Sequence, residues 1–527
     1  MFGKTKKYLR KIYGKPTDNV YKPDVNVNVR YHYDYVRRQS RDFMIDDITW
    51  DDLNMDRIYE KSNHCLTTSG EQYLYYMLRS PSREEVEYRD KCERIKFLEE
   101  NEDIRDSLRQ KLYKLGRNKV ADIFNFIKDE KTNYEKLIFY IAMGLTFIIT
   151  LILAILNYKV YLKYTTMIAI INIILYESIT KKSQVRYVTI NYALGIIRTS
   201  SKLVAELKKS GQTPSEEVLN ALAKLNPLRI YGGFSAVKTG SPMELIDALT
   251  LLVLIRLELV VSKISKFRDE LFILHSFVGE IDASIAVGSY KKCCENITTP
   301  QIEFNADAKP YIKCIDAFHP LVENCVSNSI DTEKSILITG SNASGKSTYL
   351  KTIGLNVILA QSLCFNFAKE YSATSFDTMS SMAISDDIVE GDSYYVAEIK
   401  SLKRILDYSA GGSRIFCILD ELLRGTNTVE RVAAASTILE ELAGNNLICI
   451  AATHDIELTR LLANKYNQFH FREEVVEDEM TFDYKIHEGP TKSRNAIKLL
   501  SIMGFKPETI KNSESRAGRF ITTGIWS

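Results

Sequence analysis

The pattern of hydrophobic and polar positions divides the chain into helical and α/β parts. From about residue 48 to 118, Leu, Ile and Tyr recur at three- and four-residue spacing among many charged residues, which predicts amphipathic helices. A second helical region is expected from residue 188 to about 290, and it includes a long apolar-periodic stretch at 243–274. From about residue 300 to 507, short apolar runs alternate with glycine turns, which predicts an α/β domain.

An uncharged run of twenty residues, Leu137–Leu156, interrupts the helical regions. As a helix it would be about 30 Å long, which is the thickness of the hydrocarbon core of a bilayer. A weaker apolar run, Val160–Tyr176, follows after a short polar turn. The alternative is a hairpin buried inside a large α-domain, but twenty uncharged residues exceed what an ordinary core helix needs. We therefore expect a transmembrane hairpin at residues 137–176.

Charged residues around this hairpin predict its orientation. Six Lys and Arg residues flank its outer ends, against two in and just after the turn. Cytoplasmic flanks of membrane spans carry an excess of basic residues. The expected topology is a multi-pass membrane protein with two spans, contacting lipid through both helices and keeping both termini in the cytoplasm.

Composition excludes several classes of protein. The 11 Pro and 24 Gly among 527 residues disfavour a turn-dense, all-β fold. Nine Cys without a Cys-x-x-Cys pair exclude a disulfide scaffold and a zinc ribbon. Lys and Arg total 69 against 67 Asp and Glu, so no global positive field argues for nucleic acid, and none argues against it.

The first 40 residues are locally basic, with ten Lys and Arg against three Asp. Two interpretations stay open, a solvated tail or an arm that contacts an anionic lipid surface or a phosphate backbone. The expected order of domains is a basic tail (1–45), a helical part (46–130), the hairpin (137–176), a second helical part (185–295), an α/β domain (300–510) and a tail (511–527).

A phosphate-binding loop is the strongest chemical signal. Residues 334–339 predict a buried strand that runs into a G-x-x-x-x-G-K-[ST] sequence, and an apolar helix follows. The backbone N–H groups of such a loop wrap the phosphates of ATP, its lysine reaches the β- and γ-phosphates, and the next hydroxyl ligates Mg²⁺. The expected phosphate-binding residues are Gly340, Ser341, Asn342, Ala343, Ser344, Gly345, Lys346, Ser347 and Thr348, with Ser347 also a ligand of Mg²⁺.

Two further strand ends complete the predicted nucleotide site. An apolar strand at 414–419 ends in Asp420 and Glu421, where Asp420 is expected to coordinate Mg²⁺ and Glu421 to orient the attacking water as general base. A third strand, 447–452, is followed closely by His454, which we expect to sense the γ-phosphate. A histidine at a strand end is more often structural, so this role depends on the neighbouring phosphate loop.

Residues 318–507 resemble the ATPase domain of the MutS family, a branch of the ABC-type ATPases. The matching stretches are IDAFHPLVE (315–323), TGSNASGKSTYLKTIG (339–354), LAQSLCFNFA (359–368), the segment 375–399, ILDELLRGTN (418–427) and AATHDIEL (451–458). Residues 51–81 and 278–290 resemble, less specifically, the helical core and lever of the family. The resemblance implies a C-terminal P-loop ABC-type α/β ATPase domain and an all-α core and lever region, interrupted here by the transmembrane hairpin.

The resemblance also implies a homodimer with ATP at its interface. The Ser-x-aromatic-x-x-Glu signature of the family reaches the nucleotide of the partner subunit, and here it begins at Ser393. The transporter-type LSGGQ signature is absent from the sequence. Two spans are also too few for half of an ABC transporter, which disfavours that class.

The chain departs from the family pattern at two places. Leu423 occupies a position after the Asp-Glu pair that is usually glycine. The lever-like part begins about 50 residues from Met1, which leaves no room for a mismatch-recognition domain. The resemblance therefore indicates a membrane-anchored branch of the family that lacks this domain.

Two hypotheses for function follow. The first is an ATPase of MutS type that couples ATP hydrolysis to mismatch-repair-like binding of duplex DNA. The second is a membrane-tethered ATPase switch that acts on a protein or lipid partner without DNA. The family and the basic first 40 residues favour the first, and the hairpin and the neutral net charge favour the second.

Overall fold

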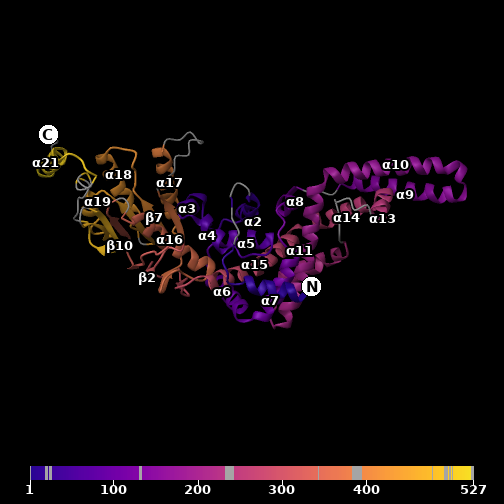
Figure 1. Cartoon of the computed structure of the whole chain (residues 1–527), viewed down its shortest axis with the longest axis horizontal. Coiled ribbons are helices and arrows are strands. Elements are labelled where there is room, and N and C mark those ends of the chain that lie inside the picture. The colour runs from indigo at the N-terminus through magenta and orange to yellow at the C-terminus, as the bar shows by residue number, and fades with distance from the viewer. Residues whose placement is uncertain are drawn as a thin grey trace. The chain divides into compact units, whose positions relative to one another are not determined.

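The computed structural model describes residues 2–17, 22, 26–129, 133–231, 242–341, 344–382, 394–444, 446–476, 479–491, 497, 500 and 503–523. The chain forms two compact units (Figure 1). Unit 1 consists of Met1–Asp42, Tyr59–Met77 and Glu93–Cys293, and unit 2 of Phe43–Ile58, Leu78–Cys92 and Cys294–Ser527.

The described part of unit 1 is helical. Its helices are α1 (Phe2–Ile12), η1 (Val27–Arg30), α2 (Tyr31–Arg37), α7 (Glu102–Leu115), α8 (Ile123–Asp129), α9 (Tyr134–Leu156), α10 (Tyr158–Lys182), α11 (Gln184–Lys209), α12 (Glu216–Leu225), η2 (Asn226–Ile230), α13 (Pro242–Thr250), α14 (Leu252–Lys266) and α15 (Arg268–Cys293). The division between the units falls within α4 (Met55–Ser62), α5 (Thr68–Arg79) and α6 (Glu85–Glu100).

Helices α11 and α15 form the centre of unit 1, since most of their residues are buried. Helix α15 is long and apolar enough to cross a membrane, yet 78% of its most apolar window is buried in the protein. Its Asp282 is fully buried and accepts hydrogen bonds from the backbone N–H and the hydroxyl of Thr67, at 2.8 and 2.6 Å. This carboxylate therefore satisfies orphan N–H groups just before α5 begins.

The basic N-terminal segment is folded in its described part. Helix α1 packs on α7, where Leu9 is fully buried and Arg10 pairs with Asp103 at 3.0 Å. His32 and Tyr33 of α2 are also buried. The interpretation of residues 1–45 as a solvated tail is therefore wrong for residues 2–12 and 26–37, because apolar burial and ion pairs fix these helices.

Helices α9 and α10 lie side by side as a hairpin that extends away from α11 and α15 (Figure 1). Both are long and apolar enough to cross a membrane, and only 22% and 17% of their most apolar windows are buried. Large apolar side chains such as Ile149 and Ile155 are exposed by 54% and 78%. A water-exposed apolar surface of this extent is rare on soluble proteins.

Helices α13 and α14 pack against the hairpin. The apolar stretch expected at 243–274 is divided at Leu251, which is left-handed with φ +54°, and again at Phe267. The amide of Asn172, buried within the hairpin, donates a hydrogen bond of 2.7 Å to the carbonyl of Leu249 beside the first break. This bond satisfies a backbone acceptor that the interrupted helix leaves open.

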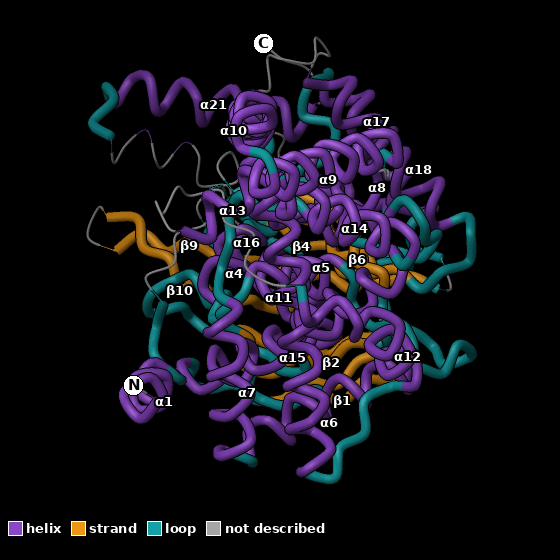
Figure 2. Tube along the Cα trace, turned by 90° about the vertical axis from the view of Figure 1, so that its right-hand side faces the viewer, coloured by secondary structure: helices purple, strands orange, loops and turns teal. Residues whose placement is uncertain are grey.

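Unit 2 contains two sheets, which Figure 2 shows as separate groups of strands. The four-stranded sheet has the order β1-β5-β2-β3, and the six-stranded sheet has the order β10-β9-β4-β8-β7-β6. The strands are β1 (Gln301–Glu303), β2 (Ile312–Ala317), β3 (Asn328–Thr332), β4 (Ile336–Thr339), β5 (Glu370–Thr374), β6 (Asp377–Ser381), β7 (Ile415–Asp420), β8 (Leu447–Thr453), β9 (Asn467–Val476) and β10 (Glu479–Glu488).

The larger sheet is parallel except for its edge strand β10. Every residue of β4, β7 and β8 is buried, as expected for strands covered on both faces. The helices of this unit are α3 (Asp47–Asp52), α16 (Lys346–Leu363), α17 (Tyr394–Ser409), α18 (Thr428–Glu441), α19 (Glu457–Leu461) and α21 (Pro507–Thr523). Mixed sheets with covering helices agree with the predicted α/β domain.

Helix α16 contacts strands of both sheets and is buried along almost its whole length. Its close contact with β7 requires Gly354, because a Cβ atom there would lie 2.2 Å from Cδ1 of Ile418. The phosphate loop is thus attached to a helix held inside the unit.

Two segments from the first hundred residues belong to unit 2, whereas the expected ATPase boundaries were 300–510. The carboxylate of Asp52, at the end of α3, accepts hydrogen bonds from the Ser380 hydroxyl at 2.6 Å and from the Met382 N–H at 3.0 Å. The Ser380 N–H donates to Thr49 at 3.0 Å. The sheet of unit 2 is therefore completed by residues that precede it by more than 300 positions.

Candidate functional site

Three neighbouring strand ends bring the predicted nucleotide residues to one edge of the sheet. Strand β4 pairs with β8, which pairs with β7, and all three are parallel. Thr339, at the end of β4, lies opposite Thr453 of β8, while Asp420 lies opposite Ala452. The carboxyl edge of a parallel sheet is the usual place for a ligand site in α/β proteins.

The described part of the phosphate loop surrounds its own lysine. The Lys346 ammonium donates to the carbonyls of Gly340 and Ser341 at 2.8 and 2.7 Å. Burial lowers the pKa of Lys346 from its ordinary value, although Asp420 opposes this change. Gly345, directly before α16, has φ +103°, a conformation that glycine adopts without strain. The chain therefore places a buried cation at the N-terminus of a buried helix.

The remaining loop residues lie around this lysine. Ser344 is buried and its hydroxyl donates to the Ser341 carbonyl at 2.8 Å, while Ser347 and Thr348 face a cavity. Asn342 and Ala343 lie outside the described residues.

Ser347 and Asp420 form an oxygen pair suited to Mg²⁺. The Ser347 hydroxyl lies 2.5 Å from Oδ2 of Asp420, and Oδ1 of Asp420 is buried without a hydrogen-bond partner among the described residues. Hard cations such as Mg²⁺ bind through few protein oxygens and complete their shell with water and phosphates. An orphaned carboxylate oxygen beside a hydroxyl fits this requirement.

Glu421 is held between two basic side chains. Its carboxylate forms an ion pair with Arg424, and its Oε2 lies 3.7 Å from Nδ1 of His454. The pKa of His454 is lowered by burial, and the cations Arg424 and Lys346 also lower it while Asp455 opposes them. The structure thus brings together both predicted catalytic residues, Glu421 and His454.

Two residues in this turn have left-handed backbones, Glu421 with φ +54° and Leu423 with φ +59°. Leu423 is the residue that departs from the glycine of the family pattern, and its side chain is 2% exposed. A left-handed leucine is strained, so surrounding contacts must hold it. Glycine adopts this left-handed conformation without strain, which explains why the family pattern has glycine at this position.

A cavity of about 660 Å³ lies beside these groups. Besides the loop and the Asp-Glu pair, it is lined by the segment 322–326 and by Phe471 and Tyr484 of β9 and β10. The Ser341 hydroxyl also bonds to the carboxylate of Glu473 on β9. The sequence analysis did not predict this wall, because only the fold brings these distant segments to the loop. Its volume is in the range of small-molecule sites.

Ser393, the expected signature residue, lies outside the described residues, and α17 begins at the next position. Among the described residues, there is no group of three or more His, Cys, Asp or Glu side chains that could hold a metal ion.

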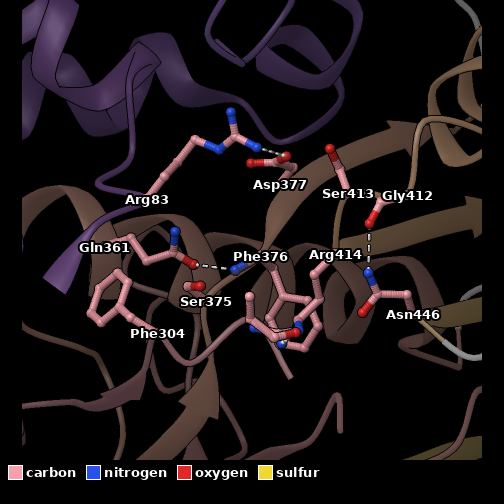
Figure 3. A pocket seen from close by; sticks show the side chains of 11 residues that line it. Arg83, Phe304, Gln361, Ser375, Phe376, Asp377, Gly412, Ser413, Arg414 and Asn446 are labelled. Atoms are coloured by element: carbon pink, nitrogen blue, oxygen red, sulfur yellow. Dashed lines mark hydrogen bonds and ion pairs between the residues drawn. The ribbon is translucent and has the colours of Figure 1, made fainter. Parts of the chain in front are cut away.

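A second cavity, of about 220 Å³, lies at the opposite, amino end of β7 (Figure 3). Arg83 and Asp377 form an ion pair of 3.0 Å there, and the Asn446 amide donates to the Gly412 carbonyl at 2.7 Å. These polar groups satisfy one another, and Arg83 attaches the segment 78–92 to the sheet. The cavity therefore has a structural explanation and is separate from the predicted nucleotide site.

Comparisons with known proteins agree with the geometry of this site. Residues 336–520 match the family MutS domain V. A DNA mismatch repair protein MutS of Petrotoga mobilis is 29% identical over 48% of the chain and 32% of that protein. MutS of Bacillus licheniformis is 31% identical over 46% of the chain and 28% of that protein, and MutS of Streptococcus pyogenes is 33% identical over 38% and 24%.

These alignments span about a quarter to a third of the length of the relatives. The matched domain contains the phosphate loop helix, the Asp420–Glu421 pair and His454, which are the groups that the structure brings together. Residues 336–520 therefore form a domain of the MutS family.

Proposed function

We propose that the protein is a Mg²⁺-dependent ATP hydrolase of MutS type. The observation that carries this proposal is the convergence of Lys346, the Ser347–Asp420 pair and Glu421 on one cavity at the carboxyl edge of the sheet. These groups supply what hydrolysis of a phosphoanhydride requires: a cation for the phosphates, a metal site and an acid that orients water.

The chain's own residues would act as follows. Lys346 would exchange the carbonyls of Gly340 and Ser341 for phosphate oxygens, and the first N–H groups of α16 would surround the same phosphates. Mg²⁺, held by Ser347 and Asp420, would neutralise charge that develops on the phosphate oxygens.

Glu421 would leave Arg424 and orient a water molecule. The water oxygen bonds to the γ-phosphorus as the bond to the bridging oxygen breaks, and the carboxylate accepts the proton. His454 would lie close enough to contact the transferred group.

Activity would require a homodimer. Ser393 of the partner subunit would lie at the start of α17 and contact the nucleotide in this cavity. Each of the two sites would then use Lys346 from one chain and Ser393 from the other.

The homodimer would couple hydrolysis to duplex DNA, in keeping with the mismatch-repair names of the relatives. The hairpin α9–α10 would hold it in a membrane, since its apolar surface is exposed in the structure. The second candidate, a tethered switch that acts on a protein or lipid partner, is favoured by that same exposed surface and by the nearly neutral net charge.

The ATPase rate of the purified protein, measured with and without matched and mismatched duplexes, tests this function. MutS-type coupling predicts that duplex DNA changes the rate. Unchanged turnover with both duplexes would favour the tethered switch, and no turnover with Mg²⁺-ATP would contradict the ATPase itself.

A further inference from the structure

A cavity of about 540 Å³ lies in unit 1 between α7 and α11, and we call it the α7–α11 groove. The described residues that line it include no acid. Four of them are basic: Lys111, Lys114, Arg198 and Lys202. The volume is large enough for a ligand with more than one charged group.

The two helices present these cations along one seam. Lys111 of α7 pairs with Glu206 of α11 at 3.0 Å, and Gly195 lies against Leu115, where a Cβ atom would be 2.8 Å from its Cδ1. Residue numbers increase along α7 in the direction in which they decrease along α11, so the two helices are antiparallel. Arg198 and Lys202 are one turn apart and face the same side of α11.

Two of the four basic residues, Arg198 and Lys202, are not neutralised by another residue in the described part of the chain. Glu206 is the acid next to the seam, and it already contacts both Lys111 and Lys209. Arg198 and Lys202 have no ion pair or hydrogen bond with another described residue. Like charges gathered in a concave site repel one another and attract an anion.

The neutral lining also suits an anion with several oxygens. Asn118, Asn191 and Thr199 contribute amide and hydroxyl groups between the cations. Arg and Lys are the side chains that most often bind phosphate, by paired hydrogen bonds and by point charge respectively.

We propose that the α7–α11 groove binds phosphate groups of an anionic ligand, at a site separate from the nucleotide cavity of unit 2. Two sources can supply such phosphate groups: the backbone of duplex DNA or a free polyphosphate. Both present closely spaced phosphate oxygens, so the test uses one probe for each source.

The test uses the 527-residue chain in detergent, with Lys202→Glu as the groove variant and Lys208→Glu as its matched control. Both lysines are exposed on α11, but Lys208 does not line the groove. The combined variant Arg198→Glu/Lys202→Glu strengthens the effect. The probes are a fluorescent duplex of mixed sequence and tripolyphosphate, each titrated at several salt concentrations.

If the source is DNA, Lys202→Glu weakens duplex binding several-fold and reduces the slope of log affinity against log salt by about one, while Lys208→Glu leaves both unchanged. If the source is a free polyphosphate, Lys202→Glu weakens binding of tripolyphosphate, Lys208→Glu does not, and the duplex does not bind to any of the proteins. ATP turnover without DNA stays unchanged in all variants, which confirms their folding.

Equal binding of both probes by wild type and the combined variant would overturn the proposal, as would binding of neither probe by the wild type. Duplex binding that survives the combined variant would refute the groove but leave DNA coupling intact. The two failures can therefore be distinguished.

Discussion

The backbone N–H of Leu423 donates a hydrogen bond to the buried carboxylate of Glu398. Leu423 is left-handed and follows Glu421 by two residues, while Glu398 lies in the first turns of α17. Burial raises the pKa of Glu398, although the N–H groups of Leu423 and Arg424 oppose this change. Glu398 of α17 thus holds the strained turn that contains Glu421, the predicted catalytic acid.

Glu398→Ala should lower kcat because the turn loses the acceptor that holds Leu423, and Glu421 moves with it. A displacement of about 1 Å can cost roughly 100-fold in rate. Glu398→Gln keeps an acceptor oxygen and should retain most of the turnover. Steady-state ATPase assays would measure kcat and KM for both variants. Wild-type kcat in Glu398→Ala would exclude this positioning role.

Glu421→Gln should retain ATP binding yet lose turnover, because Lys346, Ser347 and Asp420 remain. General bases contribute about 10²–10⁴-fold. The control is Lys346→Ala, which should weaken nucleotide binding itself. Binding of a fluorescent ATP analogue and phosphate release would separate the two effects. Turnover near the wild-type rate in Glu421→Gln would assign the base to another residue.

A mixture of two inactive variants should regain activity if the sites are composite. One carries Lys346→Ala and the other a bulky replacement of Ser393. Each mixed dimer would then contain one intact site, so part of the wild-type ATPase rate should return. Subunit exchange is verified by mass spectrometry. A fully exchanged mixture as inactive as its parents would argue against the composite arrangement.

The hairpin should keep the protein in membranes after a carbonate wash. Ile149→Arg should reduce its integration, because a charge at the centre of a span costs about 2.5–3.5 kcal/mol on insertion scales. Val86→Arg is the control, since Val86 is similarly exposed, by 59% against 54%, but lies on α6. If both variants behave like wild type and the wash releases the protein, the hairpin faces water.

Acid should destabilise unit 1 through His32. Burial, together with the nearby His275 imidazole, holds the pKa of His32 well below its ordinary value of 6.5. The unfolded chain binds the proton more readily, so stability is present above pH 6.5 and is lost as the pH falls below it. The loss should grow steadily between pH 6.5 and pH 5.

His32→Phe should lose less stability than wild type between pH 7.5 and pH 5, since phenylalanine suits the surrounding rings. His32 lies 4.9 Å from Tyr76 and 5.8 Å from Phe124, measured between ring centres. Thermal unfolding at the two pH values gives the comparison. Identical pH dependence in both proteins would show that His32 is not the responsible group.

The local secondary structure around the predicted nucleotide site could be expected from the sequence. The strands expected before the phosphate loop, Asp420 and His454, and the helix expected after the loop, all occur in the structure, because strand and helix signals are encoded within a few residues. The family match agrees with that fold at the level of an α/β ATPase domain.

Contacts between distant segments were not predictable in this way. The pairing of Leu423 with Glu398 and the cavity wall at 322–326 depend on how separate elements meet. The break at Leu251 was also missed, because its apolar neighbours continue the helical pattern on both sides. Periodicity shows which face of a helix is buried, but not which segment covers it.

The hydrogen bonds that Asp52 accepts from Ser380 and Met382 join two segments that are synthesised at different times. A ribosome adds about 5–20 residues per second, so α3 leaves it roughly 16–66 s before β6, which lies 328 residues later in the chain. During that interval the hairpin and most of unit 1 are made. Unit 2 therefore completes its fold only late in translation, because α3 is made early and its partner β6 is made much later.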